Sequence, residues 1–109
     1  MITVCVKRDT KNSIVGYRIT GHAGYDEYGR DVVCSAVSVL AQSVIIGLTR
    51  SVGIKPEYSM DAGNLYCILP PLDYKKRKEA DLLLDTMFYT LESIKQSYPG
   101  NISIFETEV

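Results

Sequence analysis

One histidine and one cysteine of this chain lie where side chains can do chemistry. His22, the only histidine among 109 residues, lies in the segment Gly21-His22-Ala23-Gly24 at the end of an apolar run, and Cys34 follows twelve residues later. Asp31 is predicted to be a helix N-cap, which would place the sulfur of Cys34 in the first turn, where unpaired N–H groups and the helix dipole favour a thiolate. A thiolate with an imidazole at hand to hold its proton is the arrangement of nucleophilic cysteine catalysis.

These residue types predict attack on a carbonyl group. The Cys34 thiolate would attack the carbonyl carbon, while His22 would hold the thiol proton and deliver it to the leaving group. Backbone N–H groups at the predicted helix start, including that of Cys34, would stabilise the oxyanion.

Three further residues flank the predicted site, and each has a second interpretation. Asp31 either orients His22 or only caps the helix. Ser38, one turn after Cys34, either bonds near the site or bonds back to the preceding turn of its helix. Gly21 either lets the chain turn sharply at the histidine or simply ends a hairpin.

Composition indicates an ordinary soluble globular protein. The net charge is −1, so the sequence gives no overall electrostatic reason to expect nucleic-acid binding. A length of 109 residues predicts a single domain over 1–109. The first residues lack the basic start and long apolar core of a secretory signal, and we expect a cytoplasmic protein.

The three cysteines do not follow a metal-binding pattern. No CxxC spacing occurs, and one histidine with three scattered cysteines suits zinc poorly. Cys5 and Cys67 fall in apolar runs typical of strands, where we expect small buried side chains. We therefore expect no metal ion and no other cofactor.

The period of the apolar pattern changes along the chain and predicts the order ββαββαβ. Two alternating runs with a turn between them predict a hairpin that ends at Gly21, and a second hairpin and a final strand follow further on. The expected strands lie at 2–7, 14–20, 56–61, 65–69 and 101–106, and the expected helices at 32–49 and around 80–98. This order predicts an α+β domain of two layers, with both helices on a mixed sheet.

The two predicted helices differ in character. No charged residue occurs from Val32 to Thr49, and apolar residues appear on nearly every side of the helical wheel, so we expect a fully buried helix. Polar and small residues dilute this stretch too much for a membrane span of about 20 apolar residues. The second helix carries apolar residues at four-and-three spacing from Ala80 to Tyr98 with charges on its other faces, so we expect it to pack on one side only.

A loop is predicted between the two candidate catalytic groups. Residues 23–30 show no apolar period, and Gly24, Tyr25, Tyr28 and Gly29 lie among them. Little burial is available there to offset the entropy of ordering the chain. We therefore expect 24–30 to be mobile, to contact a peptide, and to close when one is bound.

Three motif elements together, Gly21-His22-Ala23-Gly24, Gly29 and the run from Asp31 to Ser38, resemble the signature of the ribosomal-processing cysteine protease family, Prp. Length and element order agree with that family over the whole chain. The resemblance implies a small bacterial cytosolic endopeptidase. Its members remove an N-terminal extension from a large-subunit ribosomal protein, the twenty-seventh in the usual naming, during ribosome maturation.

The resemblance also implies roles for individual residues. His22 and Cys34 would be the catalytic dyad, and Asp31 and Ser38 would occupy further motif positions. The loop at 23–30 would be a mobile segment bordering the active site. Family members are homodimers, which would give the uncharged first helix a surface to pack against. From the net charge and the composition of the first helix, and apart from the resemblance, we expect no direct nucleic-acid binding to be required and no membrane.

Two other hypotheses remain at this point. In the first, the chain is a ribosome-associated binding module that uses the basic run Lys75–Lys78, although the acids that follow favour a solvated helix start. In the second, it is a cytosolic thiol switch, in which Cys5 or Cys67 would have to come within disulfide reach of Cys34.

Overall fold

Five strands form one mixed sheet in the computed structural model, which describes residues 1–21, 28–61 and 63–109. The strands are β1 Ile2–Arg8, β2 Ile14–Thr20, β3 Glu57–Asp61, β4 Asn64–Ile68 and β5 Ile102–Glu108, in the spatial order β3-β4-β2-β1-β5. Neighbours pair antiparallel except β1 and β5, which run parallel. Parallel neighbours require a crossover connection, and the second helix provides it before β5.

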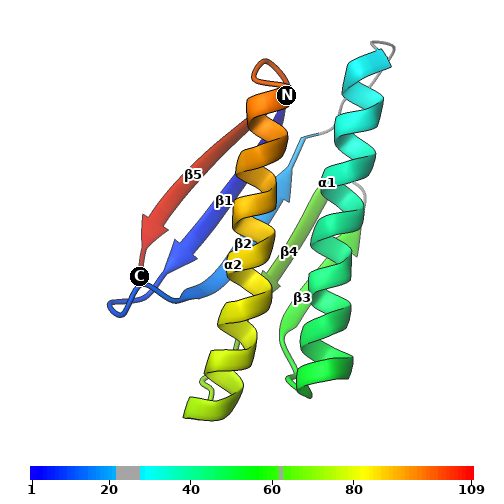
Figure 1. Cartoon of the computed structure of the whole chain (residues 1–109). Coiled ribbons are helices and arrows are strands. Elements are labelled where there is room, and N and C mark those ends of the chain that lie inside the picture. The colour runs from blue at the N-terminus through cyan, green and yellow to red at the C-terminus, as the bar shows by residue number, and fades with distance from the viewer. Residues whose placement is uncertain (22–27, 62) are drawn as a thin grey trace.

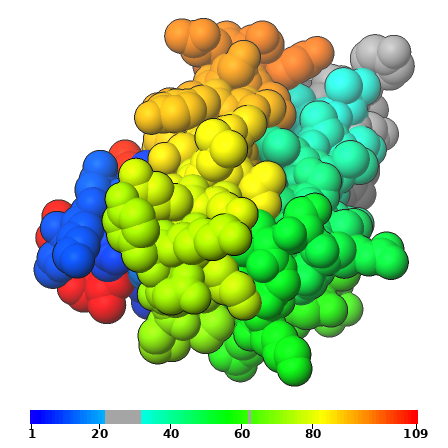
Figure 2. Space-filling model, turned by 60° about the horizontal axis from the view of Figure 1, so that its bottom comes forward, coloured from blue at the N-terminus to red at the C-terminus, as the bar shows by residue number. Residues whose placement is uncertain are grey.

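Both helices cover the same face of the sheet, so the domain has two layers (Figure 1). Helix α1 spans Tyr28–Ile46 and continues into a π-helical segment, η1, at Gly47–Val52, while α2 spans Tyr74–Ser97. Figure 2 shows α2 in yellow and the later part of α1 in green packed side by side. The predicted order ββαββαβ is confirmed.

The core lies between the sheet and the two helices. Alternate residues of the strands point to this layer, because successive side chains of a strand point to opposite faces. Fully buried members include Val4 and Val6 from β1, Val33, Val37 and Ala41 from α1, and Leu84, Met87 and Leu91 from α2. Tyr17 of β2 reaches across this layer, and its hydroxyl donates a hydrogen bond to the Ala41 carbonyl at 2.9 Å.

Helix α1 begins earlier than its sequence predicts. It starts at Tyr28, so the N-cap assigned to Asp31 and the loop assigned to residues 28–30 are wrong. An acidic residue stabilises both a cap and the first turn of a helix, so the same signal fits a start three residues earlier. Cys34 therefore lies in the second turn, where helix geometry pairs its N–H with the carbonyl of Arg30 and removes it as an oxyanion donor.

Only one face of α1 is buried. Val32 is 44% exposed, Val39 67% and Ile46 47%, so the prediction of a fully buried helix is wrong for the single chain. The sheet and α2 cover one side of α1, and no described element covers the other. The segment Val32–Val52 would also be long and apolar enough to cross a membrane. Its packing on the sheet is that of a core helix, which passes the same test of length and composition.

Helix α2 matches its predicted amphipathic pattern. Its N-cap is Asp73, whose carboxylate accepts a hydrogen bond from the Lys76 N–H at 2.8 Å. Its buried stripe consists of Ala80, Leu84, Met87, Phe88 and Leu91. The helix ends at Ser97, just before Pro99, which cannot continue a helical hydrogen-bond ladder.

Candidate active site

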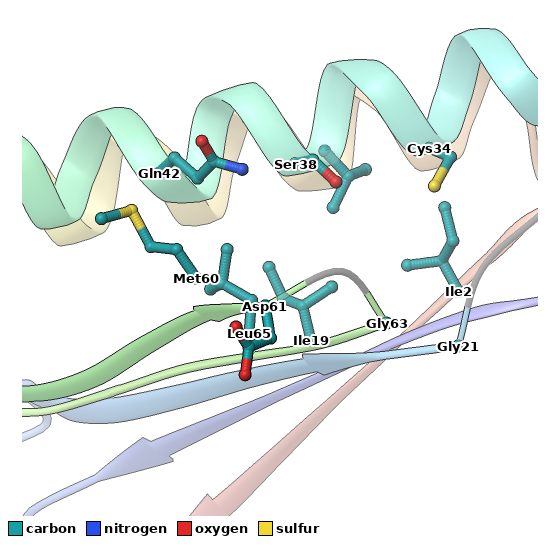
Figure 3. Close-up of a pocket in the computed structure, with 11 residues that line it drawn as sticks. Ile2, Ile19, Gly21, Cys34, Ser38, Gln42, Met60, Asp61, Gly63 and Leu65 are labelled. Carbon is teal, nitrogen blue, oxygen red and sulfur yellow. The ribbon is translucent and has the colours of Figure 1, made fainter.

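A groove of about 160 Å³ separates α1 from one end of the sheet. Helix α1 lines it with Cys34, Ser38 and Gln42, which are spaced four residues apart and therefore share one helix face (Figure 3). Helix α1 also contributes Val37, and the opposite side is apolar and is formed by Ile2, Ile19, Met60 and Leu65. Gly21, Asp61 and Gly63 complete the lining where β2 and β3 end and β4 begins.

The Cys34 thiol is half-buried and free, and Figure 3 shows its sulfur turned toward the sheet beside Ile2. One turn later, the Ser38 hydroxyl points into the same groove. No hydrogen bond from Ser38 to another described residue occurs, whereas the nearby Ser43 hydroxyl donates back to the Leu40 carbonyl at 2.7 Å. Within the part of the chain that the structure describes, Ser38 thus lines the groove and makes no hydrogen bond back to its own helix.

Gly21 is required by its backbone conformation. Its φ is +81°, in the left-handed region that side chains disfavour, and an added Cβ would collide with the Met1 carbonyl oxygen. The same residue lines the groove with Cys34. The strand end that leads to His22 and the helix face that carries the thiol are therefore brought together.

The described residues include only part of the predicted site. His22, Gly24 and Tyr25 lie outside the described residues, and so does most of the segment for which mobility is predicted. Tyr28, Gly29 and Asp31 belong to the first turn of α1. The pairing of His22 with Cys34 stays a prediction.

Of the groove residues, the sequence analysis named only Gly21, Cys34 and Ser38. Gln42 and Met60 are two of those it missed. Gln42 carried a usable signal, because it stands eight residues after Cys34 within the uncharged stretch from Val32 to Thr49. Met60 carried none: it lies opposite Leu65 in the predicted second hairpin, but its place at the groove depends on the pairing of that hairpin with β2, which no local pattern reports.

The other two cysteines lie away from the groove. Cys67 is fully buried against Tyr17, and burial raises the pKa of its thiol to about 12, although a hydrogen bond with Tyr17 opposes the shift. Burial likewise raises the pKa of the Tyr17 hydroxyl. Cys5 stands between two buried residues of β1, so it faces the uncovered side of the sheet. Among the described residues no group of three or more metal-ligating side chains occurs.

Family comparison covers nearly the whole chain. A model for the family Cysteine protease Prp matches residues 1–103. The ribosomal processing cysteine protease Prp of Bacillus subtilis is 30% identical over 107 residues, which is 95% of this chain and 96% of the relative. The protein of the same name from Staphylococcus aureus strain Mu50 is 35% identical over 107 residues, covering 95% and 97%.

Solved structures agree with this sequence relationship. The essential ribosomal processing protease Prp from S. aureus, in complex with a substrate peptide, is similar at a TM-score of 0.86 and 26% identity over 98% of this chain and 100% of that one. Its complex with a covalently linked product peptide gives a TM-score of 0.84 at 25% identity, with coverage of 98% and 100%. The chain therefore belongs to the Prp family of ribosomal processing cysteine proteases.

Proposed function

We propose that this cysteine protease removes the N-terminal extension of a large-subunit ribosomal protein during ribosome maturation, with Cys34 as nucleophile and His22 as general base and acid. One observation carries the proposal: the Cys34 thiol borders an open groove that Gly21 also lines. His22 follows Gly21 directly in the chain. Relatives bound to substrate and product peptides support a peptide as the ligand of this groove.

The reaction follows from the two side chains. The Cys34 thiolate attacks the scissile carbonyl carbon, so that a C–S bond forms and the carbonyl electrons move to oxygen. The C–N bond then breaks, and His22 gives the proton that it took from the thiol to the leaving amine. Water, activated by the same imidazole, hydrolyses the thioester and restores the thiol.

Cleavage of a defined peptide tests the proposal. Purified protein is incubated with a peptide spanning the extension and its junction with the mature ribosomal protein, and the products are identified by mass spectrometry. We expect one cut at the junction, no cut with Cys34→Ala, and normal cutting with Cys5→Ala, because Cys5 faces the other side of the sheet. Full cleavage by Cys34→Ala would overturn the assignment.

A homodimer and a cytoplasmic location are also part of the proposal. The outer face of α1 is exposed, uncharged and partly apolar, and a second copy would cover it. All three cysteines are free, as suits a reducing compartment.

Neither of the two other hypotheses gains support from the described residues. Two of the four residues of the basic run are held by the fold: Arg77 donates to the Ile14 carbonyl at 2.8 Å and pairs with Asp81, while Lys76 donates to the Gly53 carbonyl at 3.3 Å. The run is therefore not a continuous patch of free cations for a ribosome-binding module.

A thiol switch would need a second cysteine beside Cys34. Cys5 is separated from it by the sheet. Cys67 packs with Tyr17, which bonds to Ala41, seven residues or about 10 Å further along α1. Disulfide geometry requires Cα atoms within about 7 Å.

A further inference from the structure

The groove has a second end, away from the thiol. Gln42 lies eight residues after Cys34 on the same face of α1, a rise of about 12 Å. Figure 3 shows Met60 reaching up from the end of β3 toward Gln42, so these two side chains border the groove on opposite sides. Both are accessible: Gln42 is half-buried and Met60 is 39% exposed.

The chemistry of this pair suits a peptide chain. The Gln42 amide both donates and accepts hydrogen bonds, so it can pair with a peptide N–H or C=O group. It has no hydrogen-bond partner among the residues that the structure describes, and pairing with a ligand would break no described contact. Met60 is unbranched and adaptable, so it can pack against side chains of different shape.

The distance from the Cys34 thiol to Gln42 and Met60 determines which residue of the substrate these two side chains contact. An extended chain advances about 3.3 Å per residue, so 12 Å corresponds to between three and four residues from the scissile bond. In the proposed reaction the residues on the N-terminal side of the scissile bond stay attached to Cys34 as the thioester, whereas those on the C-terminal side leave with the amine. A subsite for the N-terminal side therefore holds the substrate through both steps of the reaction.

We infer that Gln42 and Met60 form a subsite that holds the substrate backbone three or four residues on the N-terminal side of the scissile bond. The inference rests on the proposed function, because it takes Cys34 as the nucleophile. Contacts far from the reacting atoms raise kcat/KM when they position the scissile bond. The subsite thus makes efficient cleavage depend on the length of the extension.

Measuring each enzyme variant with a long and a short peptide substrate tests the inference. The long peptide has six residues before the scissile bond and the short one has two, with identical residues after it. We expect Gln42→Ala to lower kcat/KM for the long peptide about fivefold, the usual cost of one lost hydrogen bond, and to leave the short peptide unchanged. Met60→Ala should act in the same direction, and the matched control Ser43→Ala, one residue along but on the outer face, should change neither.

The outcomes separate the two proposals. If Gln42→Ala affects both peptides equally, or affects neither, the subsite assignment is wrong while the protease stands. If the unmodified enzyme cleaves neither peptide, the proposed function fails and the inference falls with it. Alanine is a good helix former, so the variant helix remains intact, and circular dichroism checks this directly.

Discussion

Helices α1 and α2 lie on the same face of one sheet, yet their exposed surfaces are of different kinds. The outer face of α2 carries charges of both signs, as at Lys78, Glu79, Glu92 and Lys95. The outer face of α1 carries none from Val32 to Thr49, and one of its edges presents Cys34 to the groove. Packing against the sheet explains the buried stripe and the charged outer face of α2, but it explains only one face of α1.

The difference between the two outer surfaces indicates that α2 serves the stability of the fold, whereas α1 also serves function. A helix that serves only the core needs one apolar stripe and a solvated back, which is the pattern of α2. Helix α1 has three surfaces with separate tasks: a core stripe, a groove wall, and an uncharged outer face that we assign to a second copy. Substitutions on the two helices should therefore fail in different ways.

The largest expected contrast is between Cys34→Ala and Leu84→Ala. Loss of the nucleophile should lower kcat/KM by at least about a thousandfold with little change in folding, since Cys34 is only half-buried. Leu84 is fully buried in the core, and its truncation should cost about 2 to 5 kcal/mol of unfolding free energy. Peptide cleavage assays and urea titrations of both variants measure the two effects.

The reverse result would remove the contrast. An active Cys34→Ala enzyme, or a Leu84→Ala enzyme of unchanged stability, would show that the two helices do not divide the tasks in this way. Cys34→Ser should behave like Cys34→Ala, because a hydroxyl is far less acidic than a thiol.

The exposed faces are compared by Val39→Lys on α1 and Leu82→Lys on α2. Val39 is 67% exposed and Leu82 72% exposed in the single chain, so neither lysine should disturb folding. A lysine at the centre of a dimer interface would bury an unpaired charge, so Val39→Lys should weaken association by about a hundredfold or more. Leu82→Lys should leave association unchanged.

Sedimentation velocity at micromolar concentration measures both association equilibria. A wild-type chain that is only monomeric, or equal effects of the two lysines, would contradict the assignment of the outer face of α1 to a second copy.

The fold was largely predictable from the sequence because its signals are local. Alternation in β1 and β2 and the apolar stripe of α2 each follow from residues close in the chain. The burial of α1 was overestimated. The lack of charged residues indicates that a surface of the helix is covered, but it does not say whether the sheet, the other helix or a second chain covers it. The start of α1 was misplaced because Asp31 fits a cap and a first turn equally well.

The site was predictable only in part, and for a related reason. Gly21 and Cys34 stand in motifs whose residue types indicate chemistry, and the structure brings them to one groove. Met60 comes from a hairpin that begins more than twenty residues after Cys34. Its place depends on how β3 and β4 join the sheet, which no local pattern reports.

Two glycines at opposite ends of the α1 region give a smaller contrast. Gly21 and Gly53 share a φ of +81°, but an added Cβ would strike the Met1 carbonyl oxygen at Gly21 and would meet nothing within 4 Å at Gly53. Gly53→Ala should therefore cost only the left-handed conformation, about 1 to 2 kcal/mol. Gly21→Ala should cost more, and it should also lower kcat/KM, because the strand end beside Cys34 must shift.

Unfolding free energies and cleavage rates of both variants check this contrast. Equal losses of stability would mean that the contact with Met1 is not constraining. Unchanged cleavage by a folded Gly21→Ala enzyme would show that the backbone conformation of Gly21 does not affect the active site.

The smallest expected effect concerns two carboxylates one turn apart on α2. Burial, reinforced by the neighbouring Asp81, raises the pKa of Asp85 above its ordinary value, although Arg8 and Arg77 partly oppose the shift. The native state then holds the Asp85 proton to a higher pH than the unfolded state does, so this group lowers stability as pH rises from about 4 through the raised pKa. Asp85→Asn removes that loss.

The variant should therefore match or fall below wild type at pH 3.5 and gain on it as the pH rises to 7, by about half a kcal/mol or less for a partly exposed group. Asp81→Asn is the matched control. Asp81 accepts hydrogen bonds from Ser13 and Arg77, at 3.2 and 2.8 Å, so its substitution should destabilise the protein near neutral pH. Urea titrations across this pH range measure the unfolding free energies of both variants. A stability advantage of Asp85→Asn that shrinks with rising pH would contradict the assigned direction of the pKa shift. That result would mean that folding lowers the pKa of Asp85, because only then does ionisation of the carboxyl stabilise the folded state.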